Sequence, residues 1–176
     1  ALAPFHPLFF EEPIRPENIE AWGQLKAKLT VPLATGESLY SRFEFLRLLQ
    51  CAGADIIQPD VCVVGGLLEM RKIAAIAEAF YVPVAPHNPM GPLATAVNVH
   101  FAAACPNFKI LEYRLPGSAA YLSENQLQSE QEMSYVCDPY LPVDGHLELR
   151  PDQAGWGVKI DETYLQTDNY VHWERK

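Results

Sequence analysis

A short apolar run that ends in a polar residue and leads into a helical stretch recurs through the first two-thirds of the chain. Alternating strands and helices indicate a parallel sheet, because a parallel strand pair needs a long crossover connection. The polar residues at the ends of the runs are about 25 residues apart, which favours a (β/α) barrel over an open dinucleotide-binding sheet. The predicted strands are Leu8–Phe10, Val31–Ala34, Asp55–Ile57, Val82–Val84 and Phe108–Leu111.

Helical spacing of apolar residues, with Pro16 at a plausible first turn, predicts four helices between these strands, over 16–29, 42–50, 66–80 and 92–105. A complete eight-stranded barrel needs about 250 residues, whereas this chain has 176. We therefore expect the C-terminal part of a (β/α)8-type barrel, with roughly its last five strands. Three strands on the N-terminal side would then lie outside the chain.

The repeat stops after Glu112, and this change divides the chain. Residues 1–113 are predicted to form the partial barrel, and residues 114–176 a tail that packs on another part of the protein. Within the tail, residues 118–132 are polar and predict a loop or a short helix. Pro142–Gly145 predicts a turn, and Val158–Ile160 a short strand.

Composition excludes several classes of partner. The 22 acidic residues outnumber the 13 basic ones, for a net charge of −9, which argues against nucleic acid and anionic membranes. No apolar run reaches the roughly 18 residues of a membrane span. The four cysteines match no zinc pattern, and Cys51, Cys62 and Cys105 stand beside apolar residues. Buried free thiols are therefore expected, which indicates a reducing cytoplasm.

The polar residues at the strand ends are the candidates for chemistry. In a barrel the C-terminal ends of the strands form one mouth, so these side chains would converge there. Each residue could instead have an ordinary structural role, as a solvated strand end, a helix cap, a turn residue or a core histidine. Five independent roles of this kind would not place all five residues at the same point of the strand–helix repeat. A cluster of carboxylates repels itself unless a cation neutralises it, and carboxylate oxygens suit Mg²⁺. The residues are Glu11 (or Glu12), Glu37, Asp60, His87 and Glu112.

Seven short motifs give the chain a resemblance to a known family. They lie within residues 8–113, and the tail segment Gly155–Gly157 is similar too. Together they resemble the enolase superfamily in its mandelate racemase branch, and most closely the acid-sugar dehydratases of the galactonate dehydratase type. The motifs are Phe10–Pro13, Pro32–Ser38, Ser41–Glu44, Gln58–Asp60, Gly65–Gly66, Ala85–His87 and Leu111–Glu112.

The resemblance implies a role for each strand-end residue. Glu11 and Glu37 would be ligands of Mg²⁺, and Glu12 a structural neighbour. His87 would be the general base, oriented by Asp60. Glu112 would hydrogen-bond the carboxylate of the substrate as it becomes an enediolate. The implied reaction removes the proton next to the carboxylate of a sugar acid and eliminates the neighbouring hydroxyl, which yields a 2-keto-3-deoxy acid.

The resemblance also shows what such a site would need from outside this chain. The family's third metal ligand, its lysine-bearing strand, its capping domain and the acid for the leaving hydroxyl all precede Glu11. We therefore expect the isolated chain to be inactive and to bind Mg²⁺ poorly. Completion by an N-terminal part or homo-oligomerisation is expected, with the tail packing on the barrel or on the capping domain.

Two other functions remain open at this stage. A racemase or epimerase would use the same metal site but needs a second base on the opposite face of the substrate. A non-catalytic half-barrel would act through assembly with another chain. A racemase or epimerase would be distinguished from a dehydratase by its product. A non-catalytic half-barrel would be distinguished by the absence of turnover.

Overall fold

The computed structural model describes residues 2–114 and 135–164, which form two compact units. The first unit holds the described residues up to Asn88 together with Phe101–Glu112. The second holds Pro89–His100 and the described residues from Tyr113 onward. The predicted loop or short helix at 118–132 lies outside the described residues.

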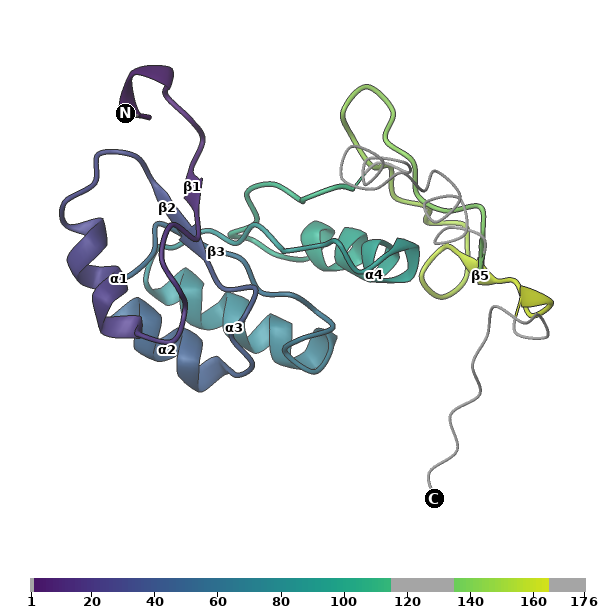
Figure 1. Ribbon diagram of the computed structural model, residues 1–176. Coiled ribbons are helices and arrows are strands. Elements are labelled where there is room, and N and C mark those ends of the chain that lie inside the picture. The colour runs from purple at the N-terminus through teal and green to yellow at the C-terminus, as the bar shows by residue number, and fades with distance from the viewer. Residues whose placement is uncertain (1, 115–134, 165–176) are drawn as a thin grey trace. The chain divides into compact units, whose positions relative to one another are not determined.

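The first unit is built on a parallel sheet. Strands β1 (Phe10–Glu11), β2 (Leu33–Thr35) and β3 (Ile56–Ile57) lie side by side in that order (Figure 1). The parallel pairing then continues through single bridges from Ile57 to Val84 and from Val84 to Phe108. Five parallel segments therefore follow the order of the sequence, which is how the strands of a barrel are arranged.

The fourth and fifth predicted strands appear only as these bridges. The backbone ladder is nevertheless present, because Val84 donates its N–H to Asn107 and its carbonyl accepts from Lys109. Pro83 has no N–H to contribute, and the last segment has a sheet neighbour only on the Val84 side in the described part of the chain. Regular strands are therefore shorter here than the apolar runs suggest.

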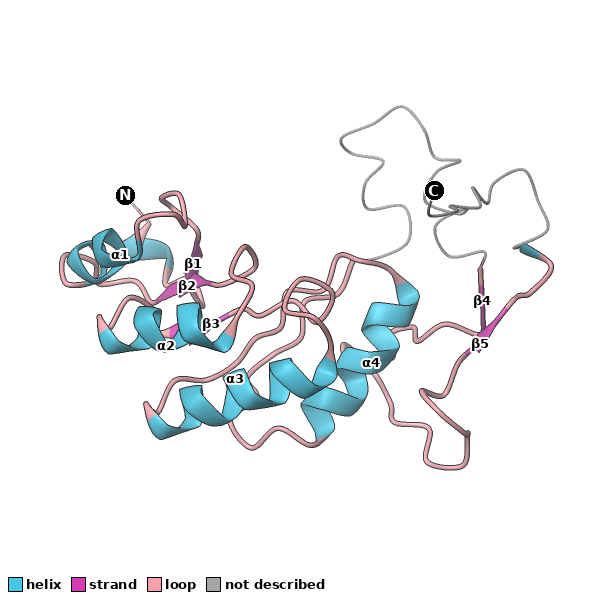
Figure 2. Ribbon diagram, turned by 90° about the horizontal axis from the view of Figure 1, so that it is seen from below, coloured by secondary structure: helices cyan, strands magenta, loops and turns pink. Residues whose placement is uncertain are grey.

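The four helices lie at the predicted positions, although the first begins after its cap Asn18 rather than at Pro16 and ends before Leu29. They are α1 (Ile19–Lys26), α2 (Arg42–Gln50), α3 (Leu67–Ala79) and α4 (Pro92–Ala103). Asn18 caps α1 by accepting from the N–H of Ala21, and Ser41 and Glu44 form a capping box at the start of α2. In Figure 2 the first three helices are the cyan ribbons beside the magenta strands β1–β3.

Apolar side chains fill both faces of the β2 region. Leu33 and Ala34 are fully buried, as expected for a parallel sheet covered on both sides. One face carries a small cluster of Ala34, Ile56 and Ala85 with Phe9 packed against it. The largest buried side chains of the helical layer are Trp22, Phe45, Leu48, Met70 and Ile73.

The second unit contains a short antiparallel pair. β5 (Lys159–Ile160) realises the strand predicted at 158–160, and its partner β4 (Val136–Cys137) was not predicted. The predicted turn at Pro142–Gly145 forms a tight hairpin closed by Val143 and His146. Its two central residues, 144 and 145, have φ of 49° and 78°, which a type I′ turn requires.

The cysteines only partly match expectation. All four are free thiols, and Cys51 and Cys105 are partly buried, whereas Cys62 and Cys137 are exposed. The predicted burial of Cys62 is wrong because the residue lies in the turn after β3, where it stays exposed although its backbone amide binds Asp60. Within the described ranges, no helix has the length and apolar character needed to cross a bilayer.

Candidate active site

Asp60 and His87 form the centre of the site. The two residues pair across neighbouring parallel segments beyond β3, and His87 Nδ1 lies 2.8 Å from Asp60 Oδ2. The side chain of Asp60 is 1% exposed, and its other oxygen accepts a 2.7 Å hydrogen bond from the N–H of Cys62. An ionised carboxylate only accepts, so the proton of this contact lies on Nδ1. Asp60 therefore fixes both the tautomer and the orientation of the ring.

Glu37 contacts the opposite edge of the same ring. His87 Nε2 lies 3.2 Å from Glu37 Oε2, and the imidazole is 15% exposed against 37% for the carboxylate. The ring is thus held between two carboxylates. Because Asp60 holds Nδ1, Nε2 is the ring nitrogen that could accept a proton from a bound molecule in place of its contact with Glu37.

The ionisation of the pair follows from this geometry. Burial alone would lower the pKa of His87, but the hydrogen bond to Asp60 and the charges of Glu37 and Glu112 outweigh it and raise the pKa. Burial alone would raise the pKa of Asp60, yet the hydrogen bonds from His87 and the amide of Cys62 hold it below its usual range. Asp60 is therefore ionised near neutral pH and makes the imidazole more basic.

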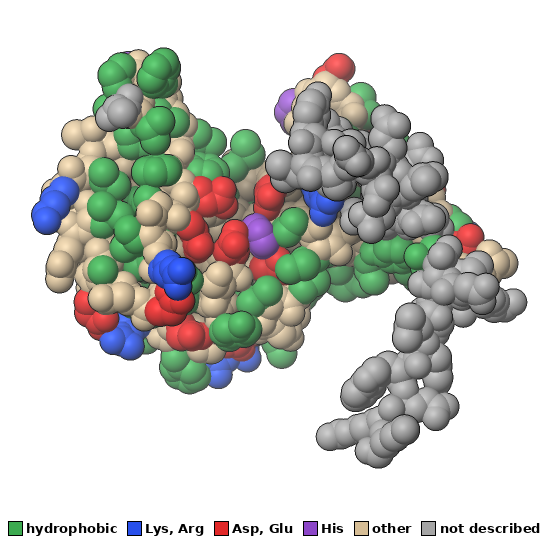
Figure 3. Space-filling model, in the orientation of Figure 1, with side chains coloured by type: hydrophobic (Ala, Val, Ile, Leu, Met, Phe, Trp, Pro, Cys, Tyr) green, Lys and Arg blue, Asp and Glu red, His purple; other side chains and the backbone are tan. Residues whose placement is uncertain are grey.

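Glu37 lies among other acids. Burial is the largest effect and raises the pKa of Glu37; the charge of His87 lowers it, and three nearby carboxylates raise it again. Figure 3 shows acidic side chains gathered around a histidine on one face of the first unit. Carboxylates near enough to raise the pKa of Glu37 repel one another unless protons or a cation neutralise them. The three carboxylates belong to Glu11, Glu12 and Glu112.

Glu11 is held from the neighbouring β3 segment. Gln58 Nε2 donates a 2.7 Å hydrogen bond to Glu11 Oε1, and Gln58 itself is buried. Both residues line a cavity of about 240 Å³ whose remaining wall is mostly apolar. Glu112 also reaches this cavity. The apolar lining consists of Leu8, Phe9, Ala85, Ile110 and Leu111.

Glu112 is anchored by the residue that follows the histidine. Asn88 donates its backbone N–H to Glu112 Oε2 at 2.7 Å and its side-chain amide to the carbonyl oxygen of Glu112 at 2.9 Å. Asn88 is buried, so these contacts are shielded from water. The end of the fifth segment is thereby tied to the end of the fourth, and the Glu112 carboxylate has a defined position.

The structure therefore brings the five predicted strand-end positions into one neighbourhood, although the contacts differ. His87 touches both Asp60 and Glu37, while Glu11 and Glu112 act on Glu37 through charge. Sequence reasoning missed the polar partners Gln58, Asn88 and Thr35. Gln58 and Asn88 lie within two residues of Asp60 and His87, so proximity to the strand end was the available signal.

Glu11 and Glu37 are the donors that could hold a cation. Both are carboxylates at successive strand ends, and the charge of Glu11 contributes to raising the pKa of Glu37. Among residues 2–114 and 135–164, no three His, Cys, Asp or Glu side chains are grouped so that they could hold a metal ion. Mg²⁺ keeps several waters and takes few protein ligands, so two carboxylates fit part of such a site.

Comparisons with known proteins place the chain. The family model described as Enolase C-terminal domain-like matches residues 1–164. D-galactonate dehydratase from Variovorax paradoxus is 50% identical over 164 residues, covering 92% of this chain and 41% of the relative. D-galactonate dehydratase from Xanthomonas oryzae pv. oryzae is 39% identical over 170 residues, covering 96% and 42% respectively.

A solved structure agrees with these relatives. An Agrobacterium radiobacter enolase, proposed to be a galactarate dehydratase and solved with Na and L-malate bound, is 63% identical. Its TM-score is 0.89, and the match covers 99% of this chain and 45% of that one. The chain thus spans about two-fifths of the length of the curated relatives it matches. The predicted resemblance and partial-barrel fold are confirmed, and the chain belongs to the enolase C-terminal domain-like family.

Proposed function

We propose that this chain is the C-terminal barrel part of a Mg²⁺-dependent sugar-acid dehydratase, a carbon–oxygen hydro-lyase. The observation that carries the proposal is the His87 ring, fixed by buried Asp60 at 2.8 Å and directed at the carboxylate of Glu37. A base held in this way beside a cluster of acids suits removal of a weakly acidic proton next to a carboxylate.

The relatives support the class of substrate. Curated proteins that match nearly the whole chain are D-galactonate dehydratases, and the Agrobacterium structure is described in terms of galactarate. Both compounds are sugar acids with a hydroxyl next to the carbon that carries the acidic proton. An aldonic or aldaric acid is therefore the proposed substrate.

In this proposal Glu11 and Glu37 hold the Mg²⁺ ion. The hydrogen bond from Gln58 to Glu11 Oε1 engages one oxygen of that carboxylate and limits its rotation. When bound, Mg²⁺ would stabilise the negative charge that develops on the substrate carboxylate. A further ligand is proposed to come from the N-terminal part of the full-length protein, as the resemblance to the family implies, and water would complete the coordination of the ion.

The chain's own residues then account for the proton-transfer step. Neutral His87, with its proton on Nδ1, takes the α-proton of the substrate at Nε2 and becomes an imidazolium facing ionised Asp60. The electron pair of the broken C–H bond moves into the substrate carboxylate, which becomes an enediolate. Glu112, anchored by Asn88, donates a hydrogen bond to this group when protonated.

Elimination completes the reaction. The enediolate collapses, the bond from the β-carbon to its hydroxyl breaks, and the hydroxyl leaves as water after it takes up a proton. We propose that the acid supplying this proton comes from outside the present chain. The resulting enol takes up a proton at its β-carbon, for which the His87 imidazolium is the proposed source, and loses its hydroxyl proton to solvent. The product is a 2-keto-3-deoxy acid, with no net oxidation or reduction.

The test is product analysis with the full-length protein that carries this chain. Incubation with Mg²⁺ and a panel of aldonic and aldaric acids should give a 2-keto-3-deoxy acid, detected as its semicarbazone, and EDTA should abolish it. An epimerised acid without keto acid would instead identify a racemase or epimerase. The absence of any turnover across the panel would contradict the assignment of an enzyme.

A further inference from the structure

Glu12 has an unusual backbone for its residue type. It follows β1 directly, and its φ is 37°, in the left-handed region that side chains other than glycine rarely adopt. That conformation strains an L-residue, because its Cβ comes too close to the following carbonyl oxygen. Strained residues of this kind persist where the surrounding structure holds them, and they gather at functional sites.

The contacts of Glu12 explain what holds it. Its Oε1 accepts hydrogen bonds from Thr35 Oγ1 at 2.7 Å and from the N–H of Gly36 at 3.3 Å. Its own N–H donates to the carbonyl of Ala34 at 3.1 Å. Every partner lies on β2 or at its exit. Glu12 therefore joins the end of β1 to the end of β2 through both its backbone and its side chain.

The left-handed turn also decides which way the side chain faces. In an extended strand, adjacent residues project to opposite faces, so Glu11 and Glu12 would diverge. In the structure the Glu12 carboxylate instead reaches Thr35 and Gly36, the two residues just before Glu37. The turn at Glu12 breaks the alternation and brings a second carboxylate to the strand end that carries Glu37.

The far side of the contact is rigid. Thr35 is 1% exposed, and Gly36 adopts φ of 142°, where a Cβ would lie 2.8 Å from Phe45 Cε1 and 3.0 Å from the backbone N of Gln58. Thr35 and Gly36, just before Glu37, therefore pack closely against the helical layer on one side and are hydrogen-bonded to Glu12 on the other. They have little freedom to move.

We propose that Glu12 is a positioning residue that fixes the Glu37 carboxylate relative to Glu11, so that the two can share one Mg²⁺ ion. This inference rests on the proposed function, since it concerns the same metal. Glu12 need not contact the ion: it acts through its hydrogen bonds to Thr35 and Gly36.

The test compares two substitutions of Glu12 in the full-length protein, with the Mg²⁺ dissociation constant measured by calorimetry. Glu12→Gly removes the acceptor and should raise the dissociation constant about 10–100-fold, as for other residues that hold metal ligands in place. Glu12→Gln keeps an oxygen for Thr35 and Gly36 and should stay within about threefold of the wild type. Glu17→Gly, at an exposed position, serves as the matched control.

Thr35→Val examines the contact from its other end. It removes the hydroxyl donor at nearly constant volume and should weaken Mg²⁺ binding in the same direction. The double variant with Glu12→Gly should bind no more weakly than Glu12→Gly alone, because both act through one contact. Fully additive losses would overturn the proposal.

Two further results would overturn it as well. Wild-type affinity in Glu12→Gly would show that the contact does not position Glu37. Equal losses in Glu12→Gln and Glu12→Gly would show that the charge of Glu12 matters rather than its hydrogen bonds. Failure of the proposed function looks different, because then the wild-type protein itself binds no Mg²⁺ and releases no keto acid.

Discussion

Each of the two units of the chain is stabilised internally by a different kind of interaction. The first has a layer of fully buried apolar side chains, among them Trp22 and Phe45, packed beside parallel strands. The second is organised around Arg150, which donates to the carbonyls of Asp138, Pro139 and Gly157 at 2.7–3.0 Å. Its guanidinium also lies 4.2 Å from the centre of the Tyr140 ring.

This difference explains why the candidate site belongs to the first unit. Parallel strands share one orientation, so the residues that follow them meet at a single edge. Asp60 and His87 meet there because their segments are neighbours in the sheet. In the described residues of the second unit, backbone carbonyls instead accept hydrogen bonds from the guanidinium of Arg150, an arrangement that organises loops rather than a row of strand ends.

The comparison also shows what sequence can predict. A regular repeat places the strand ends at nearly equal intervals along the sequence. It therefore predicted the positions of Glu11, Glu37, Asp60 and His87. The role of Thr35 was not predictable, because a threonine in a strand is ordinary until its neighbour is known. These contacts depend on backbone details such as the left-handed Glu12, which no periodicity encodes.

The same contrast appears in the tail. Val158–Ile160 was predicted as a strand, because its alternation is local, but its partner β4 was not. Arg150 makes its contacts across seven to twelve residues of irregular chain. The β4–β5 pairing and the Arg150 contacts depend on turns and on the directions of backbone carbonyls rather than on the spacing of apolar residues. The sequence pattern therefore does not predict them.

The largest effect on stability is expected in the apolar layer. Phe45→Ala removes a side chain that is 0% exposed and should lower the free energy of unfolding by about 3–5 kcal/mol. Denaturant titration of the full-length protein, with intrinsic fluorescence as the signal, measures the change. A loss below about 1 kcal/mol would show that the apolar layer is not the main source of the stability of the first unit.

An intermediate and local effect is expected at Arg150. Arg150→Met keeps the length of the side chain but loses three hydrogen bonds to carbonyls, which should destabilise the second unit by about 1.5–3 kcal/mol. Amide hydrogen exchange should speed up in 136–160 while 33–57 stays protected. Arg150→Lys should not restore protection, because an ammonium cannot reproduce the planar fork. Uniformly faster exchange in both units would contradict the division.

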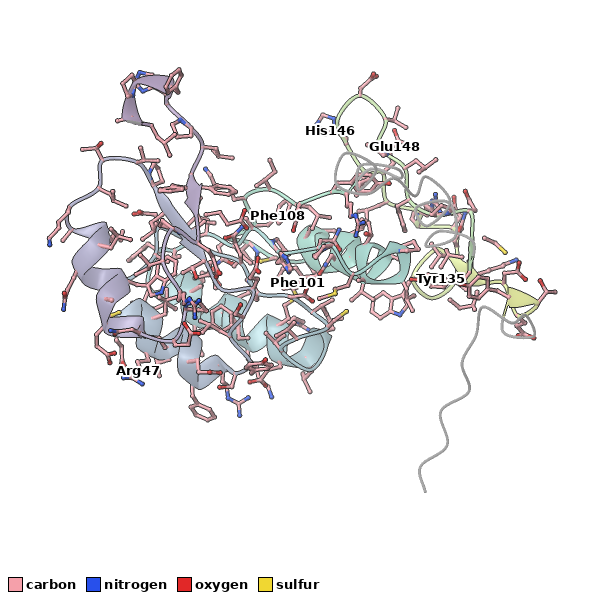
Figure 4. All side chains as sticks on the ribbon, viewed as in Figure 1. Arg47, Phe101, Phe108, Tyr135, His146 and Glu148 are labelled. Atoms are coloured by element: carbon pink, nitrogen blue, oxygen red, sulfur yellow. The ribbon has the colours of Figure 1, made fainter. Side chains whose placement is uncertain are left out.

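The smallest effect is expected at the surface of the helical layer. Arg47, labelled in Figure 4, lies on α2 and pairs with Glu20 on α1, with 62% and 56% of the two side chains exposed. Solvent screens such a pair, so Arg47→Ala should leave the unfolding midpoint unchanged within error. A clear drop in the midpoint would mean that ion pairing between helices also stabilises the first unit.

His87 is proposed to remove the proton next to the substrate carboxylate. A sugar acid lacking the β-hydroxyl cannot eliminate, so exchange of its α-proton in D₂O reports the base step alone. With Mg²⁺, NMR should show exchange by the full-length protein and by His146→Asn, which alters an exposed histidine. His87→Asn should reduce the exchange rate by about 10²–10⁴-fold. Equal exchange rates in His87→Asn and the wild type would contradict the account.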